Sequence, residues 1–165
     1  TPQTPPGWHY YMASTYTKIY IHVICVVKSR ANLIGQTWKE DLFKYMSGII
    51  THKGHKSIIV NGVSDHVHIL IGLKPAMSIS DLVRDIKNNS TNYVNENRLC
   101  PTYFSWQEGY GAFSYGHSQL DHIYKYILNQ EQHHPQKTLK AEYLEILKNN
   151  EVDYQEKYLF DWFED

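Results

Sequence analysis

Two histidines separated by one residue, His66 and His68, are the residues whose spacing points most directly to chemistry. They begin an apolar segment, 66–73, that predicts a β-strand after the hairpin signal Asn61-Gly62. Side chains alternate between the two faces of a strand, so both imidazoles should point the same way. Two imidazoles side by side are suitable ligands for a metal ion. The same spacing also fits two solvent-facing histidines on a half-exposed sheet.

A tyrosine and a glutamine four residues apart, Tyr126 and Gln130, form a second candidate pair on the predicted helix 119–133. Residues at this spacing stack on one face of a helix, so a phenol and a carboxamide can reach a shared point. Tyr126 lies at the edge of the apolar stripe, whereas Tyr124 falls inside it and is expected in the core. Alone, the pair also fits an exposed tyrosine and an exposed glutamine.

The elements that must position these residues follow the order strand, helix, two strands, helix, strand, helix. This order predicts an α+β fold, a ferredoxin-like or RNA-recognition-like two-layer sandwich with helices packed on a largely antiparallel sheet. Ser80 and Ser118 are the expected N-caps of the second and third helices. The predicted strands are 16–27, 57–63, 66–73 and 103–106, and the predicted helices are 36–52, 80–98, 119–133 and 138–149.

Length and composition bound the possible functions. The 165 residues predict one domain over 15–165, with a C-terminal helix and an aromatic tail, after an irregular proline-rich arm at 1–14. No stretch of about 18 apolar residues is present, so no membrane segment is expected. Two cysteines without metal or redox spacing, and no signal-peptide pattern, favour a cytoplasmic setting. A formal charge of −1 argues against a protein that binds long duplex DNA through charge alone.

Together the two motifs resemble the single-tyrosine HUH transposases of small bacterial insertion sequences, the IS200-like family. The resemblance covers roughly residues 15–160 and has the histidine pair and the helical Tyr-x-x-x-Gln at its centre. The further segments that carry it are Val27-Lys28-Ser29-Arg30, Asp65-His66-Val67-His68-Ile69-Leu70, Trp106-Gln107-Glu108-Gly109-Tyr110-Gly111-Ala112-Phe113-Ser114, and His133-His134.

The resemblance implies that His66, His68 and Gln130 are metal ligands and that Tyr126 is the nucleophile. Members of this family cut single-stranded DNA beside hairpins, leaving a 5′-phosphotyrosine and a free 3′-hydroxyl that later reverses the bond. They are usually homodimers in which the tyrosine helix of one subunit can complete the histidine site of the other. The partners implied are hairpin-bearing single-stranded DNA and a second copy of the chain.

The ligand types and the resemblance favour different metals. Imidazole ligands by themselves favour zinc or manganese, whereas the resemblance implies Mg²⁺ or Mn²⁺.

A tyrosine with a pKa near 10 is ionised in only about one molecule in a thousand at pH 7, so forming the phenolate costs about 4 kcal/mol. A nearby cation or base must offset that cost. His122, one turn before Tyr126, is a candidate proton acceptor.

Six basic residues are candidate DNA contacts, although each also fits an ordinary solvated charge. They are Lys28, Arg30, Lys53, Lys56, Arg84 and Lys87.

Two rival classes stay open. The first is a protein that binds single-stranded nucleic acid without cutting it, such as a domesticated transposase. The second is a histidine-metal enzyme of another kind. A barrel hydrolase needs a longer chain. A two-tyrosine initiator would need a second tyrosine near Tyr126, where positions 122 and 130 are His and Gln.

Overall fold

The computed structural model describes residues 15–133 and 136–163. The arm expected at residues 1–14 lies outside the described residues, as does His134. Among the described residues, none of the helices has the length and apolar character that a membrane crossing requires.

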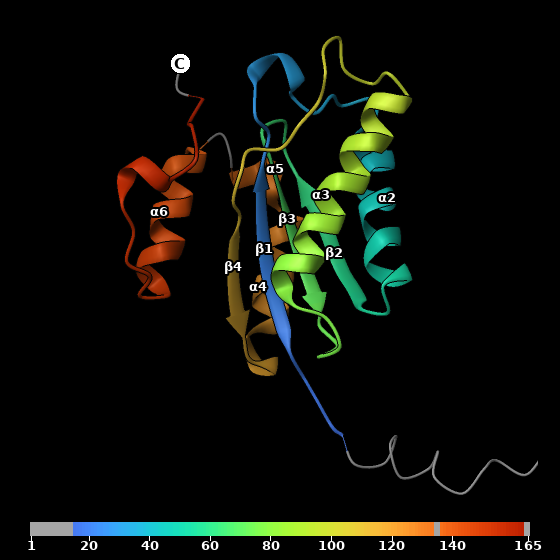
Figure 1. The fold of residues 1–165 in the computed structure, drawn as a ribbon. Coiled ribbons are helices and arrows are strands. Elements are labelled where there is room, and N and C mark those ends of the chain that lie inside the picture. Colours follow the sequence, from blue (N-terminus) through green and yellow to red (C-terminus); the bar gives the residue numbers. More distant parts are fainter. Residues whose placement is uncertain (1–14, 134–135, 164–165) are drawn as a thin grey trace, which may run out of the picture.

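One four-stranded sheet forms the centre of the fold (Figure 1). Its strands are β1 (Tyr20–Val26), β2 (Lys56–Gly62), β3 (His66–Gly72) and β4 (Gly111–Tyr115). They lie in the order β2-β3-β1-β4, and every neighbouring pair is antiparallel. Each of the two central strands, β1 and β3, is therefore hydrogen-bonded to a neighbouring strand on both sides.

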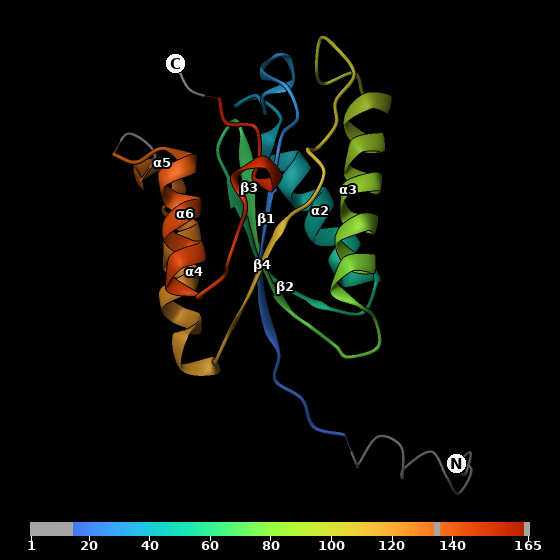
Figure 2. The same cartoon turned by 60° about the vertical axis from the view of Figure 1, so that its left-hand side comes forward.

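Helices α2 (Lys39–His52) and α3 (Ile79–Glu96) connect the strands and cover one face of the sheet (Figure 2). The resulting order, β1-α2-β2-β3-α3-β4, is that of a ferredoxin-like domain, so the predicted fold class is confirmed. The main apolar core lies in this layer, because alternate β-branched residues of β1 and β3 meet the apolar stripes of both helices. Its completely buried members include Val27, Leu42, Met46, Ile50, Ile69 and Ile86.

The other face of the sheet is covered by α4 (Leu120–Leu128), α5 (Gln130–His133) and α6 (Leu139–Asn149), as Figure 2 shows. These C-terminal helices add a layer to the ferredoxin-like sandwich. Two apolar clusters hold them. The cluster under α4 consists of Leu70, Ile123 and Ile127. The cluster under α6 consists of Ile24, Val26, Phe113, Leu139, Tyr143, Leu147 and Phe160.

The aromatic tail after α6 packs back on the body, as the sequence predicts. The ring of Phe160 lies 5.1 Å from that of Tyr143, and Trp162 lies 5.9 Å from it. The buried carboxamide of Gln107 accepts a hydrogen bond from Asp161 N at 2.7 Å and donates one to Asp161 O at 2.8 Å. The tail therefore ties α6 to the end of the sheet and fixes where α6 lies.

Two predictions about strands were wrong. The fourth strand is Gly111–Tyr115, whereas 103–106 contributes only one isolated bridge, between Trp106 and Val27. Asn61-Gly62 lies inside β2, and the hairpin turns at residues 63–65. A glycine is needed there for close approach, because a Cβ on Gly62 would lie 2.2 Å from the carbonyl oxygen of His66.

Two predictions about helices also changed. The N-cap of α3 is Ser78 rather than Ser80, since Ser78 Oγ accepts from Asp81 N at 3.1 Å. The helix predicted over 119–133 is interrupted at Asn129, so α4 carries Tyr126 and α5 begins at Gln130.

Candidate metal centre and nucleophile

The two histidines of β3 lie on the face covered by α4 and α6. His66 pairs with Val26 of β1 and His68 with Ile24, which places both rings on a central strand and on one face. The side chains are completely buried, and their ring centroids are 4.9 Å apart. The interpretation as solvent-facing histidines is therefore wrong, and the interpretation as paired imidazoles on one face is confirmed.

Each histidine is oriented by a hydrogen bond at Nδ1. The Nδ1 of His66 lies 2.7 Å from Asp65 Oδ1, and the Nδ1 of His68 lies 2.7 Å from His22 Nε2. Burial and the neighbouring His68 hold the pKa of His22 well below its usual range, so His22 is neutral and its Nε2 can accept. If both Nδ1 atoms donate, both Nε2 atoms keep a lone pair, as metal ligation requires.

Two further side chains reach the Nε2 atoms of these histidines. The Oε1 of Gln130 lies 3.3 Å from His66 Nε2. Glu142, on α6, places Oε1 3.2 Å from His68 Nε2 and Oε2 3.9 Å from His66 Nε2. Gln130 is completely buried and Glu142 is only 6% exposed. The structure thus brings together the three ligands predicted from the sequence and adds a fourth oxygen-bearing group.

The donor set fits a divalent cation. His66, His68 and Glu142 offer ligand atoms that all lie within 4.8 Å of one another. Metal bonds of about 2.1 Å place adjacent ligands of an octahedron about 3 Å apart, close to the separations between these groups. The carboxylate and carboxamide oxygens also make the site more suitable for Mg²⁺ or Mn²⁺ than two imidazoles alone. A buried carboxylate is costly unless it is paired or coordinated, which a bound cation would achieve.

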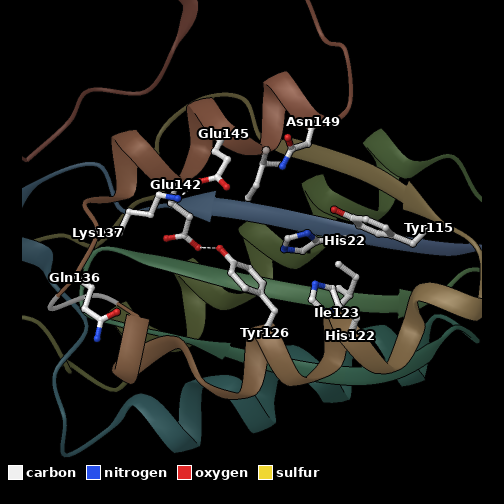
Figure 3. A pocket seen from close by; sticks show the side chains of 11 residues that line it. His22, Tyr115, His122, Ile123, Tyr126, Gln136, Lys137, Glu142, Glu145 and Asn149 are labelled. Atoms are coloured by element: carbon white, nitrogen blue, oxygen red, sulfur yellow. Dashed lines mark hydrogen bonds and ion pairs between the residues drawn. The ribbon is translucent and has the colours of Figure 1, made fainter.

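Tyr126 lies directly beside this donor set. Its ring stands edge-on to His68, with 5.8 Å between centroids, and its hydroxyl donates a hydrogen bond to Glu142 Oε1. Figure 3 shows Glu142 descending from α6 to meet the phenol rising from α4. Burial, followed by the hydrogen bond to Glu142, raises the pKa of Tyr126 above its usual range, so the hydroxyl keeps its proton in this arrangement.

The position of Tyr126 follows from how α4 is rotated on the sheet. Ile123 and Ile127 are buried, whereas Tyr124 is 37% exposed. The prediction that Tyr124 belongs to the core was wrong, because the buried face is displaced toward Tyr126.

Asn61 fixes the C-terminal end of α4. Its Nδ2 donates to the carbonyl oxygens of Ile127 at 2.8 Å and Leu128 at 3.1 Å. These carbonyls lie in the last turn of the helix, where backbone acceptors lack partners within the helix. Asn61 thereby ties the tyrosine helix to β2 of the same chain.

The predicted DNA contacts are divided between two regions. Lys28 and Arg30 are exposed just after β1, at the end of the sheet where β3 begins with His66. The guanidinium of Arg30 lies 5.9 Å from the centre of the Phe163 ring. Lys56 begins β2 at the opposite end of the sheet, where it pairs with Gly72.

The three remaining basic residues lie on or directly after the helices that cover the other face. Lys53 lies 3.3 Å from Asp85, and Arg84 lies 3.0 Å from Asp81. Lys87 donates to the carbonyl oxygens of Gln107 and Gly109, and burial lowers its pKa. The structure therefore does not bring these three residues to Tyr126.

The candidate proton acceptor His122 lines the cavity that also borders Tyr126 (Figure 3). The carboxylate in contact with the tyrosine hydroxyl is that of Glu142.

Sequence reasoning missed His22, Asn61 and Glu142. His22 was hidden in an apolar strand, where alternation with Ile24 and Val26 is the only signal that it faces the site. Asn61 has the signature of a turn residue. Glu142 lies in the first turn of α6, where an acidic residue ordinarily complements the helix dipole. Its position three residues after Leu139 was the available signal, since Leu139 faces the sheet.

Comparison with known proteins agrees with this geometry. The family model described as "Transposase IS200 like" matches residues 15–130, a segment that includes both histidines, Tyr126 and Gln130 but ends before Glu142. No curated protein matched the chain significantly.

Two solved structures share the fold. A "putative transposase" from Deinococcus radiodurans R1 is 23% identical, with a TM-score of 0.55 over 71% of this chain and 94% of that one. A REP-associated tyrosine transposase bound to a REP hairpin is 16% identical, with a TM-score of 0.55 over 92% of this chain and 89% of that one. Because the family model covers well over half of the sequence, the chain belongs to the IS200-like family of transposases.

Proposed function

We propose that this transposase cleaves and rejoins single-stranded DNA through a covalent 5′-phosphotyrosine at Tyr126. The observation that carries the proposal is the convergence of Tyr126 with two oriented imidazoles and a buried carboxylate. Tyr126 Oη attacks the phosphorus of the scissile phosphodiester, and the bond from phosphorus to the 3′ oxygen breaks. The phenolic proton leaves Oη, and the departing 3′ oxygen takes up a proton to become a hydroxyl. Attack by a 3′-hydroxyl on the phosphotyrosine reverses these changes and rejoins the strand.

Four side chains would hold the divalent cation, Mg²⁺ or Mn²⁺: His66, His68, Gln130 and Glu142. When bound, the cation would stabilise negative charge on the phosphate during transfer. His22 and Asp65 keep the two imidazoles in the tautomer that ligates. Glu142 Oε1 accepts a hydrogen bond from the Tyr126 hydroxyl, so its carboxylate is placed to take the phenolic proton when Oη attacks.

The DNA is proposed to be single-stranded with hairpins at the ends of the element. Support comes from the related tyrosine transposase, which was solved with a REP hairpin. Lys28 and Arg30 are the proposed phosphate contacts nearest the site, because they follow β1 where β3 begins. The homodimer implied by the family stays a prediction, which sedimentation velocity checks. In the described chain, Tyr126 lies against its own His68, so one subunit holds all the groups named above.

Cleavage of defined oligonucleotides tests the proposal. Single strands spanning both flanks of the gene are incubated with Mg²⁺, Mn²⁺ or EDTA, and the products are separated on denaturing gels. We expect metal-dependent cleavage that leaves a free 3′-hydroxyl, and its loss in His68→Ala. For Glu142→Gln we expect a rate at least about tenfold lower, the scale on which metal sites respond to loss of a supporting group.

Glu151→Gln controls for a general effect of removing one negative charge near the C-terminal end of α6, since Glu151 is exposed and does not line the cavity beside Tyr126. Tight binding to these strands without cleavage would contradict the proposal. It would favour the alternative, a non-cutting protein that binds single-stranded nucleic acid.

A further inference from the structure

A cavity of about 430 Å³ opens beside the nucleophile, between α4 and α6 (Figure 3). Pockets of about 300–1,000 Å³ typically accept ligands of drug size. Tyr126 and Glu142 form the wall shared with the metal centre, so a group in the cavity would be adjacent to the reacting phosphate. The other side chains that line the cavity are not among the proposed metal ligands.

Part of the cavity lining is aromatic and aliphatic. His22 and Tyr115 contribute rings whose centroids are 6.1 Å apart, and Ile123 and Ile146 lie in the same lining. His22 is 1% exposed, and its Nδ1 has no hydrogen-bond partner among the described residues. Flat rings next to a buried polar atom suit a planar group that has polar edges.

The charges around the cavity disfavour a phosphate inside it. Two carboxylates, Glu142 and Glu145, line it together with a single ammonium group, that of Lys137. Lys137 is already in an ion pair with Glu145. Like charges repel an anion, so the phosphate would stay at the metal centre and a neutral group would enter the cavity.

We propose that this cavity takes the nucleobase of a nucleotide that flanks the scissile phosphodiester, a proposal that rests on the proposed function. An unpaired base has a neutral planar ring, and bases stack on aromatic side chains. The base would stack on Tyr115, and the carboxamide of Asn149 at the rim offers both a donor and an acceptor to its edge. Tyr115 then acts as a substrate-binding residue outside the metal centre.

Fluorescence of 2-aminopurine tests the proposal directly. A single-stranded trinucleotide with 2-aminopurine at its centre is titrated with the full-length protein in the presence of Mg²⁺, because stacking quenches this base. For Tyr115→Leu we expect binding about 5- to 150-fold weaker, which corresponds to about 1–3 kcal/mol of base stacking at 1.4 kcal/mol per tenfold change. Ile146→Trp, which fills the cavity from α6, should abolish the quenching.

Tyr103→Leu is the matched control, since Tyr103 is 71% exposed and does not line the cavity. Mn²⁺ affinity is measured on the same proteins and should be unchanged in all of them, which verifies that each variant folds. Equal quenching by wild type, Tyr115→Leu and Ile146→Trp would overturn the proposal, as would the absence of quenching with wild type. Quenching that depends on Tyr115 without DNA cleavage would overturn the proposed function and leave the nucleobase site standing.

Discussion

Replacing His22 by phenylalanine is expected to weaken metal binding while leaving the metal-free fold nearly as stable. In the wild type, His22 Nε2 lies 2.7 Å from His68 Nδ1, where it can accept a hydrogen bond from the Nδ1 proton. Without this acceptor, metal-free His68 can move the proton to Nε2, which lies 3.2 Å from the carboxylate oxygen Oε1 of Glu142. The phenylalanine ring would pack near Phe113 and Tyr115, whose rings lie 6.2 and 6.1 Å from that of His22.

In His22→Phe, metal binding requires the His68 proton to return to Nδ1, where it is buried and has no hydrogen-bond acceptor. An unsatisfied buried donor costs about 1–3 kcal/mol. That cost corresponds to roughly 5- to 150-fold in affinity, and loss of comparable supporting groups weakens metal binding by about 10–100-fold. We therefore expect a dissociation constant for Mn²⁺ raised by about one to two orders of magnitude, with little change in the urea midpoint of the metal-free protein.

Isothermal titration with Mn²⁺ measures this effect. His22→Gln should restore part of the affinity, because its carboxamide oxygen can accept the hydrogen bond. His117→Phe is the control, since His117 is exposed and its ring neighbour is Tyr20 rather than a ligand. Wild-type affinity in His22→Phe would refute the argument that the hydrogen bond to His22 sets the tautomer of His68.

Three further outcomes are expected. Asn61→Ala should lower the free energy of unfolding in urea by about 1–2 kcal/mol, because two helix carbonyls lose their donor, and it should also lower the yield of DNA cleavage. Asn97→Ala removes a similar hydrogen bond at the end of α3 and should leave the yield of DNA cleavage unchanged. An equal decrease in cleavage in Asn61→Ala and Asn97→Ala would contradict a positioning role for Asn61.

His55 accepts from Lys74 N at 3.0 Å, and burial lowers its pKa. As the pH falls below about 6.5, His55 takes up a proton in the unfolded chain before it does so in the folded one, so the free energy of unfolding should decrease. His55→Gln should flatten this dependence of the free energy of unfolding on pH. The same dependence in His55→Gln and wild type would refute the argument. Lys28→Ala should reduce the slope of log affinity for single strands against log salt by about 0.7, and Arg84→Ala should not. Equal slopes for the two variants would contradict the assignment.

The fold could be predicted from sequence because its signals are local. The β-branched run of β1 and the helical spacing in α2 agree with the structure to within a few residues. Strand β4 was missed because Gly111–Tyr115 is short and begins with a glycine, and its pairing with β1 is a long-range contact. The rotation of α4 was missed for a similar reason, since packing against Leu70 decides which side of an amphipathic helix is buried.

The candidate site was predictable where spacing along one element brings ligands together. His66 and His68 share a strand face, and Gln130 follows Tyr126 by one helical turn. Glu142 and His22 come from other elements, and only the docking of α6 and the register between β1 and β3 bring them to the same point. Apart from its position three residues after Leu139, Glu142 resembles an ordinary first-turn acid.

The most direct test of the central claim is to identify the residue that becomes covalently attached to DNA. Protein incubated with the flanking single strands and Mn²⁺ is digested, and the DNA-linked peptide is sequenced by mass spectrometry. Tyr124→Phe provides a matched control on the same helix, because Tyr124 is 37% exposed and does not line the cavity beside Tyr126. The account predicts an adduct on Tyr126 that survives Tyr124→Phe and disappears in Tyr126→Phe and His68→Ala. An adduct that persists in Tyr126→Phe would contradict it.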